Sequence, residues 1–188
     1  MTSHYEENFE SVTFTTDMMA DAQFECCTFK NCILRDIQFK NLVFEECEFF
    51  SCDFTGSNLN SIALRSIDFN ECKLIGLNFE GVNPFRLSIR FYDCLLDYAS
   101  FYKLTLKGGV FENCSLKSVE FSEANLSKAN FTGSKLDDAI FEQTNLSQAD
   151  FRTSAGYRIN PMSNTIRGAK FSKEEVMGLL VDFAIKIE

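Results

Sequence analysis

Large apolar residues recur at every fifth position along most of this chain. Positions 9 to 79 carry Phe or Leu at every centre except one, Met19, and positions 91 to 151 carry them without exception. The centres are Phe9, Phe14, Met19, Phe24, Phe29, Leu34, Phe39, Phe44, Phe49, Phe54, Leu59, Leu64, Phe69, Leu74, Phe79, and then Phe91, Leu96, Phe101, Leu106, Phe111, Leu116, Phe121, Leu126, Phe131, Leu136, Phe141, Leu146 and Phe151. Neither the helical period of 3.6 nor the strand period of 2 generates this spacing. It predicts a chain that turns a corner every five residues and points one large side chain inward on each side.

The residue two positions before the centre is also small or apolar, as at Ala22, Cys27 and Ala124. Two residues in five therefore face inward and three face outward. Units such as Ala129-Asn130-Phe131-Thr132-Gly133 resemble the A-(D/N)-(L/F)-x-x unit of pentapeptide-repeat proteins. The resemblance implies a right-handed quadrilateral β-helix, in which four repeats close one 20-residue coil.

The second series provides an independent test of the 20-residue coil. Residues 20 apart are all Phe on two opposite sides and all Leu on the other two, so each coil would keep the same cross-section. With coils separated by the ~4.8 Å spacing of strands, we expect about seven layers. The two series are offset by two residues near Asn83-Pro84, and these extra residues form either an outward kink or a functional loop.

The five-residue period stops after Phe151, and a helix signal follows. Ser172-Lys173-Glu174-Glu175 reads as a capping box, in which Ser172 caps a helix and Glu175 reaches back to it. Apolar residues then follow at helical spacing. We expect a single domain over 1–188, with the β-helix at 7–153, a turn segment at 154–171, and a C-terminal helix and tail at 172–188. This helix either plugs the open end of the stack or joins two copies in a homodimer. The predicted dimer interface consists of Val176, Met177, Leu179, Leu180, Phe183, Ile185 and Ile187.

The eight cysteines and the single histidine provide no recognisable catalytic or metal site. Seven cysteines occupy the small inward position, where a free thiol behaves as a compact hydrophobe. The Cys-x4-Cys spacing places neighbouring thiols on different sides of a coil, so we expect no metal. His4 is the only histidine and falls in an N-terminus that we expect to be mobile, so no Ser-His or Cys-His pair is available. We predict no enzyme activity and no cofactor.

Charge is distributed unevenly along the chain. The net charge is −9, and residues 1–79 carry 13 acidic and five basic residues. By the 20-residue rule Glu25 stacks beneath Glu45, and Glu48 beneath Asp68. Stacked like charges are mildly destabilising, so they are either tolerated at the surface or kept for a partner. The candidate partner-binding acids are Glu25, Glu45, Glu46, Glu48, Asp53, Asp68 and Glu71.

Membrane and nucleic-acid partners are disfavoured by the same composition. A net-negative protein is repelled by phosphate backbones, so we expect no direct binding of nucleic acid. Residues 1–11 lack the regions of a signal peptide, and no stretch approaches the roughly 18 apolar residues of a membrane helix. We therefore expect a cytoplasmic protein that does not enter a membrane.

The tail resembles one branch of the pentapeptide-repeat family. Asn160-Pro161 followed by Phe171, Glu175 and Leu179-Leu180 is similar to the tails of Qnr-type quinolone-resistance proteins and the microcin B17 immunity protein. The resemblance implies a DNA-mimicking homodimer that binds DNA gyrase or topoisomerase IV and protects it from quinolones or a gyrase toxin. The alternative is a non-catalytic scaffold that binds another protein through its flat faces.

Overall fold

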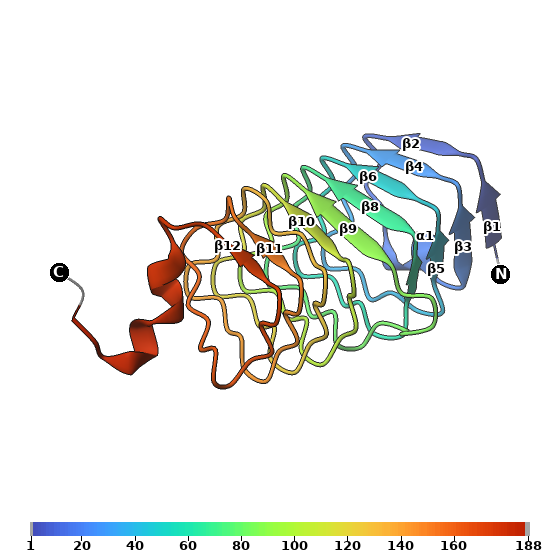
Figure 1. The fold of residues 1–188 in the computed structure, drawn as a ribbon. Helices are drawn as coiled ribbons and strands as arrows, with labels where there is room; N and C mark the ends of the chain where they lie inside the picture. The colour runs from blue at the N-terminus through green and yellow to red at the C-terminus, as the bar shows by residue number, and fades with distance from the viewer. Residues whose placement is uncertain (1, 187–188) are drawn as a thin grey trace.

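The chain winds into a four-sided β-solenoid of about eight turns, each of about 20 residues (Figure 1). The computed structural model describes residues 2–186. Successive turns pair in parallel at an offset of 20, as between Phe24 and Phe44 and between Phe29 and Phe49. The 20-residue coil of four repeats, which the resemblance to pentapeptide-repeat proteins implied, is therefore confirmed.

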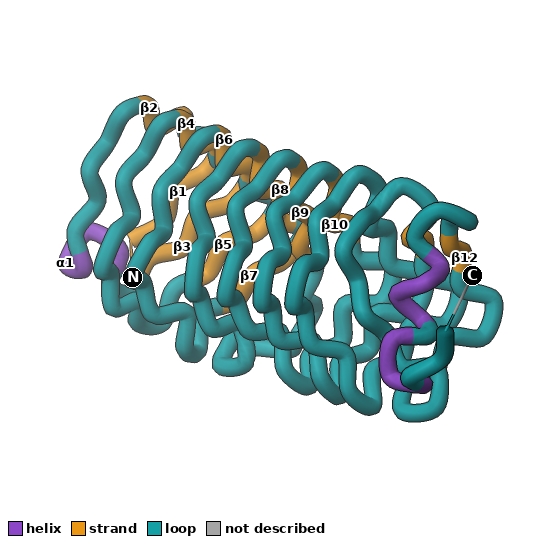
Figure 2. The backbone as a smooth tube through the Cα atoms, turned by 90° about the vertical axis from the view of Figure 1, so that its left-hand side faces the viewer, coloured by secondary structure: helices purple, strands orange, loops and turns teal. Residues whose placement is uncertain are grey.

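Two adjacent sides of the solenoid form regular sheets, and the other two are held by isolated bridges and turns (Figure 2). The first sheet has the order β1 (Thr2–Tyr5), β3 (Ala22–Glu25), β5 (Val43–Glu45) and β7 (Ala63–Arg65). The second contains β2 (Asn8–Glu10), β4 (Thr28–Lys30), β6 (Glu48–Phe50), β8 (Ile67–Asn70), β9 (Ile89–Tyr92) and β10 (Val110–Glu112). The remaining elements are α1 (Thr16–Met19), the short pair β11 (Asp150–Phe151) and β12 (Lys170–Phe171), and two 3-10 turns, η1 (Val176–Leu179) and η2 (Val181–Phe183).

The corners lie two residues after the inward centres and adopt left-handed backbone conformations. Cys26 and Asn31, for example, have φ of 54° and 53°. Side chains other than Gly, Asn and Asp rarely adopt this region. The inter-coil hydrogen bonds on both sides of each corner, such as Cys26 N to Glu45 O at 3.0 Å, hold the backbone there.

The inward aromatic residues form continuous ladders through the core. Phe111 stacks between Phe91 and Phe131, with ring centroids 5.3 and 5.2 Å away. It meets Phe101 and Phe121 of the facing ladder edge-on at 5.5 and 5.6 Å. Edge-to-face contacts are favourable for aromatic pairs, so the two ladders interlock along the rod.

The two-residue offset lies between Asn83 and Ile89. Ala63 still pairs with Asn83, at an offset of 20, whereas Ile67 pairs with Ile89, at an offset of 22. The extra residues bulge outward and leave the Phe85 side chain 65% exposed. Beyond the bulge the aromatic ladder continues without a gap, because Phe69 stacks on Phe91 at 5.4 Å.

Coil pairing extends beyond the expected limits of 7–153 at both ends. Thr2 already pairs with Ala22, and Phe171 still pairs with Phe151. His4 belongs to β1, and its ring stacks on Phe24 at 4.6 Å, so the expectation of a mobile N-terminus there is wrong. These additions raise the expected seven layers to about eight turns.

The predicted C-terminal helix is wrong: residues 176–183 form only the two 3-10 turns. Ser172 Oγ does accept a hydrogen bond from Glu175 N at 3.1 Å, as in a capping box. Glu175, however, accepts from Gly156 N at 3.3 Å instead of reaching back to Ser172. Gly178 lies against Tyr157, and its carbonyl accepts from Ile159 N at 3.0 Å, so the segment is attached to the last coil instead of continuing as a helix.

Candidate partner-binding surface

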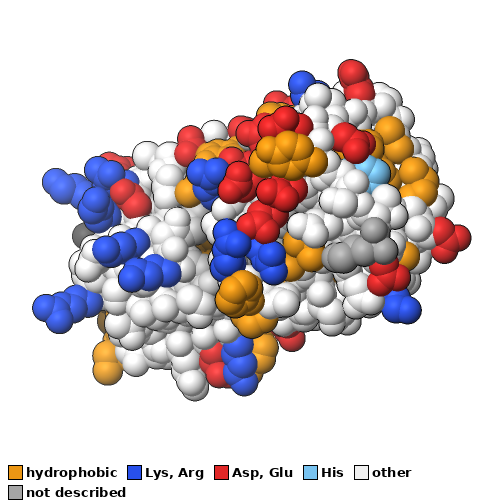
Figure 3. Space-filling view, turned by 90° about the vertical axis from the view of Figure 1, so that its right-hand side faces the viewer, with side chains coloured by type: hydrophobic (Ala, Val, Ile, Leu, Met, Phe, Trp, Pro, Cys, Tyr) orange, Lys and Arg blue, Asp and Glu red, His pale blue; other side chains and the backbone are white. Residues whose placement is uncertain are grey.

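Five of the candidate acids gather at the corner between the two regular sheets. Glu25 and Glu45 stack on the outer face of β3 and β5, and Glu48 and Asp68 stack on β6 and β8, as the 20-residue rule predicts. Glu46 occupies the corner itself, with φ of 53°. We call these five residues the acidic corner: Glu25, Glu45, Glu46, Glu48 and Asp68. Figure 3 shows acidic side chains clustered on this face of the rod, with Lys and Arg beside them.

Two members of the acidic corner are held by arginines that the sequence analysis did not anticipate. Glu45 contacts Arg65 at 3.0 Å and Arg86 at 2.7 Å. The hydrogen bond from Arg65, together with the charge of Arg86, lowers the pKa of Glu45. Asp68 accepts two hydrogen bonds from Arg90, at 2.5 and 2.7 Å. These contacts neutralise much of the charge of two acids whose side chains are only 17% and 18% exposed.

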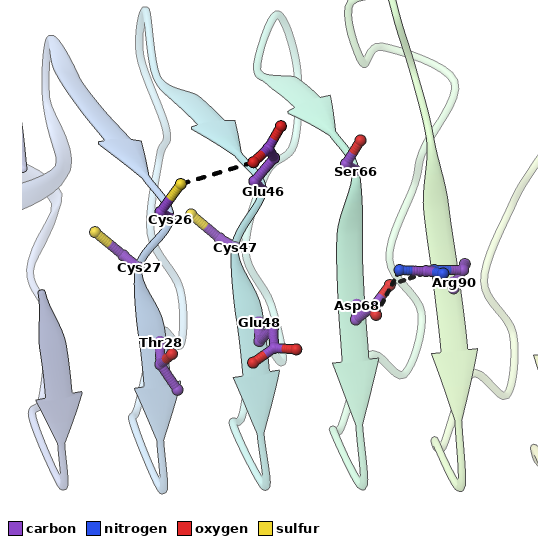
Figure 4. A pocket seen from close by; sticks show the side chains of 9 residues that line it. All are labelled: Cys26, Cys27, Thr28, Glu46, Cys47, Glu48, Ser66, Asp68 and Arg90. Atoms are coloured by element: carbon purple, nitrogen blue, oxygen red, sulfur yellow. Dashed lines mark hydrogen bonds and ion pairs between the residues drawn. The ribbon is translucent and has the colours of Figure 1, made fainter. Parts of the chain in front are cut away.

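Glu46 and Glu48 are exposed and stand beside a shallow depression of about 260 Å³ (Figure 4). Its lining also includes Cys26, whose Sγ lies 3.7 Å from Glu46 Oε2. In Figure 4 the Glu48 carboxylate makes no hydrogen bond or ion pair with the other lining residues. Glu46 and Glu48 are consequently the acids of the corner most available to an outside group.

Asp53 and Glu71 lie away from the acidic corner. Asp53 is in a column with Ile33 and Lys73 on the next side of the coil. Burial raises its pKa, but hydrogen bonds from Thr55 and the charge of Arg35 outweigh this, and the net shift is downward. Glu71 Oε2 accepts from Ser51 Oγ at 3.1 Å. Neither residue extends the acidic corner.

Charge along the same column changes in the C-terminal half. The residues paired in sequence above Glu48 and Asp68 are Arg90, Val110, Asn130, Asp150 and Lys170. Asp150 is itself paired with Arg152 at 2.7 Å and Lys170 at 3.9 Å. Figure 3 accordingly shows mainly Lys and Arg toward the C-terminal end of this face. Along this column the anionic stretch therefore ends at Asp68.

The arginine contacts left a partial signal in the sequence. Arg65 lies one full coil after Glu45, so the stacking rule alone identifies that pair. Arg90 lies one coil plus two positions after Asp68, and Arg86 projects from the bulge onto Glu45. Finding these two required knowing where the two extra residues enter the coil.

The predicted dimer-interface residues divide into two groups. Leu179 packs against the core and Leu180 is half-buried, so both help to cover the end of the stack. The more exposed side chains are Val176, Met177, Phe183 and Ile185, with exposed fractions of 37–56%. Ile187 lies outside the described residues. The surface at this end is thus partly cap and partly unpaired apolar area.

The seven inward cysteines are buried as predicted, and only Cys26 is partly exposed. The register shift joins five of them into one column: Cys32, Cys52, Cys72, Cys94 and Cys114. Ser134 follows in that column, where its Oγ accepts from Cys114 N at 2.8 Å. Within residues 2–186 no three His, Cys, Asp or Glu side chains are arranged to hold a metal ion. None of the helices in the same range is long and apolar enough to cross a membrane.

The same architecture is found in solved structures of other proteins. Two solved structures of QnrB1, a plasmid-mediated fluoroquinolone resistance protein, superpose over nearly the whole chain. A trypsin-treated form of a point variant gives a TM-score of 0.61 at 20% identity, covering 100% of this chain and 98% of that one. The full-length form gives 0.53 at 15% identity, covering 97% and 100%. At such identities the likeness concerns the fold alone.

Most of the sequence matches models of one kind of repeat. No curated protein matches the chain. Residues 104–179 match the family described as a pentapeptide repeat region. Residues 22–60 and 47–83 match the family described as pentapeptide repeats (8 copies). The predicted family is thereby confirmed, and the chain belongs to the pentapeptide-repeat proteins.

Proposed function

We propose that this chain is a non-catalytic binding protein whose acidic corner docks onto a basic surface of a type II topoisomerase, DNA gyrase or topoisomerase IV. Bound there, it would protect the enzyme against quinolones or a gyrase toxin. The observation that carries the proposal is the position of the exposed Glu46 and Glu48 on a rod with the fold of QnrB1. A basic surface that normally binds DNA phosphates would also attract carboxylates, and counterions would be released when the two surfaces meet, as they are when DNA binds.

The arginines narrow the part of the surface that could act as a DNA mimic. Glu45 and Asp68 are already paired, so Glu25, Glu46 and Glu48 supply most of the uncompensated negative charge. Since the same column carries Arg90 and Lys170 further on, the contact would involve the N-terminal half of the rod. A single rod offers one short anionic segment, and a dimer would offer two.

We further propose that two copies join through the C-terminal segment, with the exposed Phe183 and Ile185 at the contact. A two-fold contact places the same patch on both partners, so the two acidic corners would lie on opposite distal arms. Phe183→Asp should convert a dimer into a monomer in sedimentation equilibrium. A wild-type protein that sediments as a monomer at micromolar concentration would contradict the dimer.

A supercoiling assay tests the topoisomerase proposal. Purified protein is titrated into gyrase and relaxed plasmid, with and without a fluoroquinolone. We expect inhibition or drug rescue by the wild type, and at least a tenfold higher requirement for the Glu46→Lys/Glu48→Lys variant. The matched control is Asp138→Lys/Glu142→Lys, which makes the same charge change at exposed positions of the C-terminal half. Neither inhibition nor rescue at micromolar wild-type protein would reject the proposal.

The second candidate is a scaffold that binds a different protein. The pairing of Glu45 and Asp68 with three arginines favours it, because a surface selected only to imitate DNA would leave those carboxylates unpaired. Phe85 is exposed and lies beside Arg65, whose guanidinium carbon is 5.6 Å from the ring centroid. Aromatic residues and arginines are enriched in protein interfaces. A wild type inert toward gyrase and topoisomerase IV would leave this candidate in place.

A further inference from the structure

The N-terminal end of the rod presents two strand edges that no described residue pairs with. β1 ends the four-stranded sheet and β2 ends the six-stranded sheet, as the N-terminal end of Figure 1 shows. The unpaired N–H and C=O groups of an edge strand are a template for another extended chain. The opposite end of the rod is different, because residues 172–186 lie across it.

The core at this end is covered incompletely: His4 and Phe9 are only partly buried, whereas Phe14 and Met19 of the same coil are buried. His4, Phe9, Phe14 and Met19 are the inward residues of the first coil, and Phe9 contacts both His4 and Phe14 at 5.6 Å. Phe29 of the second coil stacks on Phe9 at 4.9 Å. Within residues 2–186 nothing stacks on the other face of the Phe9 ring, and the side chain is only partly buried.

The rim of this end is strongly acidic. Residues 2–21 contain no Lys or Arg, and all five of their carboxylates are exposed: Glu6, Glu7, Glu10, Asp17 and Asp21. Only His4, at 3.0 Å from Glu7, offers a basic group. Two copies meeting end to end would bring two such rims together, and like charges repel. The charge therefore disfavours a second copy and favours a basic occupant.

We propose that the edge of β2 binds an extended segment of another protein in which basic and apolar residues alternate. The segment adds a strand beside Asn8–Glu10 and places its apolar side chain over Phe9, as Phe29 does from the other side. Side chains alternate between the two faces of a strand, so the Lys or Arg residues that flank the apolar one point outward beside Asn8 and Glu10, where Glu10 and the neighbouring exposed Glu7 attract them. The backbone supplies affinity, and the rim supplies the preference for positive charge.

The test uses the full chain and the synthetic peptide Ser-Gly-Lys-Phe-Lys-Val-Lys-Gly-Ser. Amide NMR spectra should show peptide-induced shifts centred on residues 7–11, weakening as salt is added. The same peptide with N-methylated backbone at its Phe and central Lys should bind at least tenfold more weakly, because it cannot complete the strand edge. A peptide with Glu in place of Lys should not bind.

A protein variant provides the second arm. Glu7→Lys/Glu10→Lys should weaken binding at least tenfold with an unchanged circular dichroism spectrum, while Asp138→Lys/Glu142→Lys should bind as the wild type does. Shifts that map away from β2, or equal binding of the N-methylated peptide, would overturn the proposal. So would a wild type that binds no peptide while Glu7→Lys/Glu10→Lys self-associates, because the rim would then serve only to keep copies apart.

Discussion

Arg90 lies directly opposite Asp68 in the parallel sheet, and its guanidinium donates to both carboxylate oxygens, at 2.5 and 2.7 Å. The pair is separated by one coil plus the two extra positions of the bulge. If the turn had kept the 20-residue offset with the same sequence, Ser88 would lie opposite Asp68. The bulge thus determines which residue meets this carboxylate, and the hydrogen bond raises the pKa of Arg90 further above its ordinary value.

Removing the arginines should strengthen the attraction of the acidic corner for cations. Arg86→Gln/Arg90→Gln releases Glu45 from one of its two arginines and Asp68 from Arg90. We expect several-fold tighter binding of poly-lysine at low salt, with a steeper salt dependence, measured by isothermal titration calorimetry. Weaker binding would mean that the arginines are themselves contact residues.

Stability should fall in acid partly through Glu45. Because the hydrogen bond from Arg65 and the charge of Arg86 lower the pKa of this carboxyl in the folded state, its contribution is complete above its unfolded pKa of about 4.3. The contribution is lost as pH falls through the lowered folded pKa. Urea unfolding from pH 6 to pH 3 should show a shallower loss for Glu45→Gln than for wild type. Equal slopes would show that the arginine contacts do not persist in solution.

The aromatic ladder should be sensitive to truncation at its centre. Phe111→Ala removes a buried ring that contacts four others, and we expect a loss of about 3–5 kcal/mol in the free energy of unfolding. Tyr98→Ala, at a side chain 60% exposed, should change it by less than about 0.5 kcal/mol. Urea denaturation followed by circular dichroism measures both. Similar losses for the two variants would contradict the ladder as a source of stability.

Thiol chemistry should distinguish Cys26 from the other seven cysteines. Only Cys26 is partly exposed, and desolvation together with the nearby Glu46 charge raises its pKa. Native protein should therefore release about one equivalent of thiolate product with Ellman's reagent, slowly at pH 7 and faster at pH 9. Guanidinium should expose all eight. Rapid reaction of several thiols in native protein would show that the coils open.

The C-terminal segment should detach when Gly178 gains a side chain. A Cβ at this position would overlap the Tyr157 carbonyl oxygen, so Gly178→Ala cannot keep the present contact. Amide exchange in residues 172–186 should accelerate at least tenfold, while the coils before residue 150 stay protected. Glu174→Ala, at an exposed position, is the matched control. Unchanged exchange in Gly178→Ala would place the segment elsewhere.

The fold was largely predictable because each repeat buries the same two side chains. A Phe or Leu every five residues predicts a chain that turns a corner in each repeat. The Phe and Leu columns, which recur at intervals of 20, indicate four repeats in each coil. The stacking of Glu25 with Glu45 and of Glu48 with Asp68 followed from the same rule. The C-terminal helix was predicted wrongly because Ser172 and the apolar spacing are local signals, and contacts of Gly178 with Tyr157 override them.

The sequence alone determined which side chains enter the core, since burial of a periodic apolar pattern depends little on where the coil begins or shifts. Only the tertiary structure decided which charges meet. The bulge takes up two residues of one turn, so that Arg90 lies opposite Asp68 and Arg86 reaches Glu45, while Glu46 and Glu48 remain exposed. The physical reason is that an outward side chain has no fixed partner until the register of the neighbouring coil is set.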